Sequence, residues 1–304
     1  MSTAASTSPG SQASSESAAR SVVASLTDEE IDVLCDGDHH VVVLPHLSLL
    51  GEQETRSARR VAERSLAARG LLLPGSDGGH GGADDRADRT VAVHELLAPL
   101  LQMRRGAPVV VVLHRTPTAD LASTGTSSHG PGGDASHRDP VDGITATAPG
   151  TPSSLTRYLF VLDGACVCED VTAQGVHTLS MARVAHLAEL LTELLVPPGA
   201  CAPPGSATIV GDPTDLPWTL HRLGHPTVLA ESTVLHPWLA PGQAPARLLV
   251  LGPGGCYHAA LGEVSRWVCR PVSPEDLVRL LVAEVGAAAR RVEQESTGHN
   301  GGRD

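Results

Sequence analysis

Two stretches of this sequence share one pattern: TRYLFVLDGACVCEDVTAQGVHTLSMARVAHLAELLTELL, residues 156–195, and ARLLVLGPGGCYHAALGEVSRWVCRPVSPEDLVRLLVAEV, residues 246–285. Each reads as an apolar strand, a glycine turn, two further strands and a helix with leucines on one face. Identical residues recur at a constant offset of ninety: Arg157/Arg247, Leu159/Leu249, Cys166/Cys256, Leu187/Leu277, Leu190/Leu280 and Leu191/Leu281. A chain rich in leucine and valine produces some identities by chance, so the shared order of elements is the stronger argument for a repeat.

Two copies of a three-strand, one-helix unit predict an α+β fold. We expect one pseudo-two-fold domain in which a central, mainly antiparallel sheet is flanked by helices. The linking segment, residues 207–238, reads as strand, helix and strand. Ser273, Pro274 and Asp276 form a capped start for the last helix.

The first half of the chain adds helices in front of the repeat. Thr27 and Glu30 predict a capping box at the start of a short helix. A second helix is expected over 53–69, where Gly70 ends it, and a third over 92–104, where Pro99 marks either a kink or the true start. The valine run in 107–116 predicts a strand covered on both faces.

Four segments lack apolar periodicity and are rich in Gly, Ser, Thr, Pro or Asp. They are 1–20, 75–89, 117–155 and 293–304, and we expect them to be disordered because they bury too little apolar surface to offset the entropy of ordering. We expect residues 22–288 to form a single domain with disordered insertions at 75–89 and 117–155, and the rest of this range is long enough for its own core.

Composition narrows the class of protein. The chain has 22 basic and 34 acidic residues, a formal net charge of −12, which disfavours nucleic acid as a partner. Its basic residues are all arginine, which suggests a GC-rich, actinobacterial genome. No apolar run is long enough to span a membrane, no secretory signal opens the chain, and the six cysteines are scattered, so we expect a cytoplasmic protein.

Signatures of catalysis are missing from the sequence. There is no Gly-x-Ser-x-Gly nucleophile elbow, and without lysine there is no phosphate-binding P-loop. His39, His40 and His46 lie close together, but no Cys-x-x-Cys or His-Glu-x-x-His spacing accompanies them. Cys166 and Cys168, on one face of a strand, read as small buried apolar residues.

Two alternatives stay open. Cys256 and His258 share one strand face, so a thiol- or metal-dependent enzyme using this pair and the clustered histidines is one alternative. The arginines of the 53–69 helix suggest a DNA-binding face, but they fit the solvated side of an amphipathic helix more simply.

The few aromatic residues all follow residue 157. Phe160 is expected in the core. Aromatic side chains are frequent anchors of protein interfaces, and five of them are candidate partner-binding residues: Tyr158, Trp218, Trp238, Tyr257 and Trp267.

The order of parts resembles the EspG-like proteins of actinobacterial type VII secretion. The resemblance rests on LTDEEIDVLC (26–35), AERSLAARGLLL (62–73), VHELLAPLLQMRRGAPVVVVLHR (93–115) and the two repeated stretches, and it covers most of residues 22–288. It implies a cytosolic chaperone that holds the exposed hydrophobic tip of a helical substrate, such as a PE–PPE heterodimer or a small WXG-like protein. No diagnostic motif fixes the binding residues, and the polar segment 117–155 is longer than the pattern leads one to expect.

We therefore expect a non-catalytic chaperone or adaptor without metal or other cofactor. An apolar groove between sheet and helices would bind the partner, and the acidic surface would keep the complex in solution.

Overall fold

A computed structural model of the chain describes residues 20–37, 41–73, 92–119, 154–212, 215–236, 244, 246–261 and 266–300. The first half forms β1 (Arg20–Thr27), α1 (Asp28–Leu34), α2 (Glu52–Ala68), β2 (Leu72–Leu73), β3 (Ala92–Val93), α3 (Ala98–Gly106), β4 (Val109–Pro117), β5 (Leu155–Leu162), β6 (Ala165–Thr172), β7 (Val176–Arg183) and α5 (Leu187–Leu195). The second half forms β8 (Ile209–Gly211), α6 (Leu216–Arg222), β9 (Val228–Leu235), β10 (Arg247–Gly252), β11 (Gly255–Leu261), β12 (Trp267–Val272) and α7 (Pro274–Asn300).

The central feature is a 10-stranded antiparallel sheet, with strand order β1-β7-β6-β5-β4-β9-β10-β11-β12-β8. This order is symmetric about the β4–β9 pair, because each half runs outward through three hairpin-connected strands to an edge strand. Leu113 of β4 lies opposite Ser232 of β9, and the approximate two-fold axis passes between them. The predicted fold class is confirmed. The symmetric unit is larger than the predicted one, since it also includes β4 with β1 and β9 with β8.

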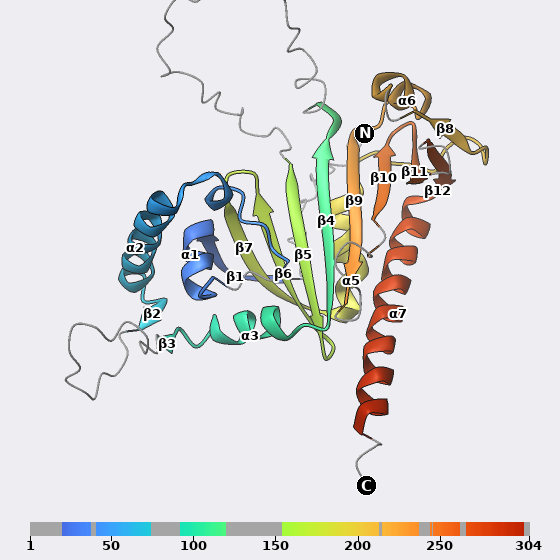
Figure 1. Cartoon of the computed structure of the whole chain (residues 1–304). Helices are drawn as coiled ribbons and strands as arrows, with labels where there is room; N and C mark the ends of the chain where they lie inside the picture. The colour runs from blue at the N-terminus through green and yellow to red at the C-terminus, as the bar shows by residue number, and fades with distance from the viewer. Residues whose placement is uncertain are drawn as a thin grey trace, which may run out of the picture.

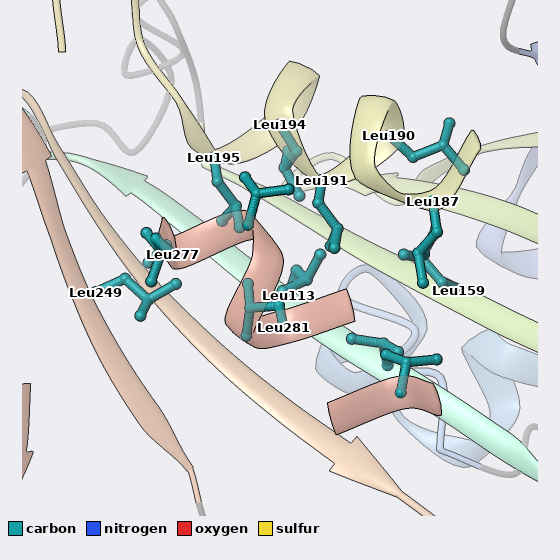
Figure 2. Close-up of a cluster of buried hydrophobic side chains, with 14 of the residues drawn as sticks. Leu113, Leu159, Leu187, Leu190, Leu191, Leu194, Leu195, Leu249, Leu277 and Leu281 are labelled. Carbon is teal, nitrogen blue, oxygen red and sulfur yellow. The ribbon is translucent and has the colours of Figure 1, made fainter. Parts of the chain in front are cut away.

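One face of the sheet is covered by α5 and α7, the two repeat helices. Their leucines meet over the central strands in a single apolar cluster (Figure 2), so both halves share one core. Leu191 of α5 and Leu281 of α7, ninety residues apart, are both fully buried there. Cys166 and Cys168 belong to this cluster, as expected for small apolar residues.

The opposite face is covered at its two ends by different structures. Helices α1, α2 and α3 lie over the β7–β6–β5 side, and α6 lies at the other end (Figure 1). We call helices α1, α2 and α3 the first layer. They enclose an apolar cluster that includes Phe160. At the other end of the sheet, Leu223, which directly follows α6, belongs to a smaller cluster with Val250 and Tyr257. The core position expected for Phe160 is confirmed.

A chain of buried charges ties the first layer to the sheet. His177 Nε2 lies 2.6 Å from Asp28 Oδ1, and His177 Nδ1 lies 2.7 Å from Glu169 Oε1. Glu169 Oε2 is in turn 2.8 Å from Nε of Arg104 on α3. Burial alone would lower the pKa of His177, but the hydrogen bonds to the two carboxylates outweigh it and raise that pKa. Two positive and two negative groups thus balance inside the core.

Several boundaries follow the prediction closely. Thr27 and Glu30 form the expected capping box, and Ser273 Oγ accepts a hydrogen bond from the Asp276 N–H at 3.0 Å. Residues 207–238 contain the expected strand, helix and strand. Pro99 marks the true start of α3, because the residues before it form β3 and a turn.

Other expectations need correction. The segment preceding α1, for which no element was predicted, is the edge strand β1; it begins at Arg20, inside the segment expected to be disordered, and its apolar alternation is irregular. The tail predicted from 293 is instead helical as far as Asn300, because α7 continues through Glu293, Gln294 and Glu295, which have good helix propensity, into its last turn. Pro117 and Leu155 belong to β4 and β5, and the rest of the 117–155 segment lies largely outside the described residues, as do 1–19, 74–91 and 301–304.

The arginines of α2 are also more than a solvated face. Arg69 Nη1 lies 2.8 Å from Oε2 of the buried Glu30, and Arg59 Nε lies 3.0 Å from Asp32 Oδ2. These pairs attach α2 to α1, so part of the charged side of α2 faces the protein.

Candidate functional site

The middle of the sheet is uncovered on the face that carries α1–α3 and α6. A groove of about 520 Å³ lies there, over β4, β5, β6 and β9. Its apolar lining is Val43, Pro45, Val112, Tyr158, Val171 and Ala173. Its polar lining is His114, Ser154, Thr156, Thr172, Glu231 and Thr233. We call this concavity the sheet groove.

The groove exists because the two halves are unequal. Among the described residues, the segment between β1 and β4 contains the α-helices α1, α2 and α3, whereas the segment between β8 and β9 contains α6 alone. Helices α1–α3 therefore cover the β7 side of the first half and α6 covers only the far end of the other half, which leaves β4, β9 and parts of β5 and β6 open between them. Figure 1 shows β4, β5 and β9 lying between these two layers. An apolar sheet face left open in this way is a common place for a partner to bind.

The wall of the groove on the first-layer side is built by Tyr158 and Val43. The Val43 N–H donates a hydrogen bond to Tyr158 Oη at 3.1 Å, which holds the 41–46 segment against β5. The Tyr158 ring is buried, and burial raises the pKa of its hydroxyl. The Val43 side chain is 59% exposed, so this wall presents apolar surface to solvent.

The floor of the groove carries a short polar strip across the two-fold axis. His114 on β4 is directly opposite Glu231 on β9, and Val112 is opposite Thr233. His114 Nδ1 is 2.9 Å from Thr156 Oγ1, and Thr116 Oγ1 is 3.2 Å from His114 Nε2. Both imidazole nitrogens are therefore occupied by threonine hydroxyls, which holds the ring in the floor.

The candidate aromatic residues divide between two places. Tyr158 lines the sheet groove. Tyr257 is 5% exposed in the cluster beneath α6, and Trp267 packs against the same cluster. Trp218, on α6, is 46% exposed and lies under the Arg222 guanidinium at 4.8 Å. Trp238 lies outside the described residues. The structure thus brings one of the five to the groove.

The Cys256–His258 pair has the wrong electrostatics for a nucleophile. Cys256 is fully buried on the α7 face, and burial raises the pKa of its thiol. Burial and the neighbouring Arg247 lower the pKa of His258, whose Nε2 lies 3.3 Å from Arg247 Nη1. An activated cysteine needs a lowered thiol pKa beside a charged imidazole, and both groups shift in the opposite direction.

The described residues contain no group of three or more His, Cys, Asp or Glu side chains arranged to hold a metal ion. His46 is exposed near Glu29, while His39 and His40 lie outside the described residues. In the described part of the chain, no helix combines the length and the apolar character needed to cross a membrane.

Sequence reasoning missed most of the groove. His114 begins the polar end of β4, and Glu231, Ser232 and Thr233 form a polar stretch within β9; these polar stretches were the available signal. Their side-by-side position depends on the β4–β9 pairing, which joins strands more than a hundred residues apart in the sequence.

The fold is thus an α+β domain with a large antiparallel sheet, and its site is an open, largely apolar groove. No protein-family model matches the chain, and no curated protein sequence matches it. Among solved structures, it is similar to that of the Mycobacterium tuberculosis type VII secretion system chaperone EspG5 in complex with the PE25–PPE41 dimer. The similarity covers 86% of this chain and 95% of that chain, at 13% sequence identity and a TM-score of 0.44. This is a distant structural similarity.

Proposed function

We propose that this protein is a non-catalytic chaperone or adaptor that binds an apolar helical tip of a partner protein in the sheet groove. The observation that carries this proposal is the uncovered, apolar middle of the sheet between two helical layers. The resemblance of the sequence pattern to EspG-like proteins supports a PE/PPE- or WXG-like helical partner and a cytoplasmic setting.

The dimensions and lining of the groove suit a helix end. A volume of about 520 Å³ is enough for several side chains, and half of the lining residues are apolar. Burying apolar surface of the partner contributes roughly 25 cal/mol per Å² before the costs of ordering are subtracted. An amphipathic helix that lays its apolar side into a groove is a recurrent mode of recognition.

Binding in the groove would keep the partner in solution. An exposed hydrophobic tip would otherwise associate with other apolar surfaces. Covering it with a protein whose net charge is −12 would keep the complex in solution.

The proposal is tested by co-expression with the small helical proteins encoded beside its gene. We expect one of them to co-purify as a stable complex with the wild-type chain. In the Val43→Asp variant, a charge enters the groove wall at a side chain that is 59% exposed, so the complex should be lost while the thermal midpoint of the chaperone changes little.

Val61→Asp provides the matched control. Val61 lies on α2, away from the sheet groove, and is 57% exposed, so its substitution makes the same chemical change at similar exposure. It should leave the complex intact. Equal effects of the two variants, or recovery of both proteins as independent monomers with the wild type, would contradict the proposal.

A further inference from the structure

The sheet groove has one charged side chain among its lining residues, Glu231. Glu231 lies on β9 at the centre of the floor, next to the two-fold axis, and its side chain is exposed. Within the described part of the chain, its carboxylate has no hydrogen-bond or ion-pair partner. A single unpaired carboxylate thus stands in a mostly apolar concavity.

The residue opposite Glu231 that could neutralise its carboxylate, His114, already bonds to other side chains. His114 faces Glu231 across the β4–β9 pair, but its ring nitrogens bond to Thr156 and Thr116. The other neighbour on this floor, Thr233, is uncharged. The groove therefore offers Glu231 no charge partner of its own.

This arrangement has a consequence when the groove is occupied. A partner that covers the floor removes water from the Glu231 carboxylate. If the partner is wholly apolar, the charge loses hydration without gaining a partner, which opposes binding. If the partner carries a guanidinium or ammonium group at that point, the charge is compensated and fixes the register of binding.

We infer that the occupant of the groove is an apolar helical tip that carries one arginine or lysine placed to meet Glu231. Glu231 is then a specificity-determining residue, since it admits a tip with this cation and rejects helices that are only apolar. The inference rests on the proposed function, and it further specifies that the partner carries a positive charge at its tip.

Phage-displayed helical hairpins with randomised tips provide the probe. The full-length chain is immobilised as wild type and as Glu231→Lys, and groove-dependent clones are those that bind the wild type but not Val43→Asp. We expect wild-type selections to be enriched in one arginine or lysine within an apolar tip. Selections on Glu231→Lys should replace that residue by aspartate or glutamate.

The affinity of a selected lysine-bearing clone gives the quantitative readout. Its Kd should rise about tenfold for Glu231→Gln, as expected for loss of a close charge pair. The Kd should be unchanged for Glu63→Gln, which removes the same charge from an exposed position on α2 outside the groove.

Two contrary outcomes separate the inference from the proposed function. Groove-dependent clones whose charge is the same for wild type and Glu231→Lys would overturn the inference and leave the proposed function standing. If no clone distinguishes wild type from Val43→Asp, the groove is not a helix-binding site, and both are overturned.

Discussion

Arg157 and Asp170 form a bidentate ion pair inside the protein, with Nε 2.6 Å from Oδ1 and Nη2 2.8 Å from Oδ2. Arg157 Nη1 also donates a hydrogen bond to the Leu190 carbonyl of α5 at 2.7 Å, so the arginine attaches the helix to the sheet. The equivalent residue in the second half, Arg247, pairs with Glu284 of α7 instead, and the residue ninety positions after Asp170 is Ala260. Both halves therefore hold their helix through the same arginine, but only the first does so in the core.

This difference predicts unequal costs for the same substitution. Among the described residues, Arg157→Met leaves the buried Asp170 with Arg20 as its remaining ion-pair partner, so the free energy of unfolding should fall by about 3 kcal/mol. Arg247→Met removes a pair whose side chains are both 27% exposed, and should cost less than about 1 kcal/mol. Urea unfolding of the two variants measures the difference, and equal losses would contradict the assignment.

The His177 network predicts a dependence of stability on pH. The folded pKa of His177 is raised above its ordinary value of 6.5, so its contribution is complete below about pH 6.5 and is lost as pH rises through the folded pKa. The pKa values of Asp28 and Glu169 are lowered in spite of burial, mainly by hydrogen bonds to His177, so their contribution is lost as pH falls below their ordinary range.

Urea midpoints between pH 5 and pH 9 test this prediction. The wild type should lose stability progressively above about pH 6.5, because the imidazolium between the two carboxylates is deprotonated. The His177→Gln variant should be less stable at pH 6 and should not show this decline. The same alkaline decline in both proteins would assign it to other groups.

Gly175 is placed where a side chain would collide with the same network. Its φ is +71°, and an added Cβ would lie 2.8 Å from the carboxyl group of Asp28. The backbone N–H of Asp28 donates a hydrogen bond to the Gly175 carbonyl. Gly175→Ala should therefore combine the cost of a left-handed alanine with a displaced Asp28, about 2–4 kcal/mol in total.

Gly164 separates these two contributions. Its φ is +79°, but an added Cβ would meet nothing within 4 Å, so Gly164→Ala should cost only the backbone strain, about 1–2 kcal/mol. Thermal and urea unfolding of both variants would reveal the extra cost at Gly175. A loss at Gly164 as large as at Gly175 would exclude a contribution from the Asp28 contact.

The shared core predicts a sharp contrast between adjacent leucines of α7. Leu281 is fully buried where α7 meets α5 over the sheet, and Leu281→Ala should cost about 2–5 kcal/mol. Leu280 is 39% exposed on the other side of the same helix, and its alanine variant should cost less than about 1 kcal/mol. Both substitutions leave helix propensity similar, so a comparable loss would mean that α7 is not docked as described.

Much of the local structure was accessible from the chain alone. The period of the leucines identified α5 and α7, Thr27 with Glu30 and Ser273 with Asp276 identified helix starts, and the offset of ninety between Arg157 and Arg247 identified the repeat. These features depend on residues within a few positions of one another, or on a pattern copied along the chain. Short-range hydrogen bonds and side-chain periodicity are sufficient to specify them.

The groove, its one free carboxylate and the buried charges depend on contacts between distant segments. His114 meets Glu231 only because β4 pairs with β9, and His177 meets Asp28 only because β1 closes the sheet beside β7. The pairing of distant strands depends on how the helices on both faces bury the sheet. This burial is a property of the whole packed core. This packing brings residues that are distant in the sequence into contact. The local pattern of the sequence does not specify which of them will become neighbours.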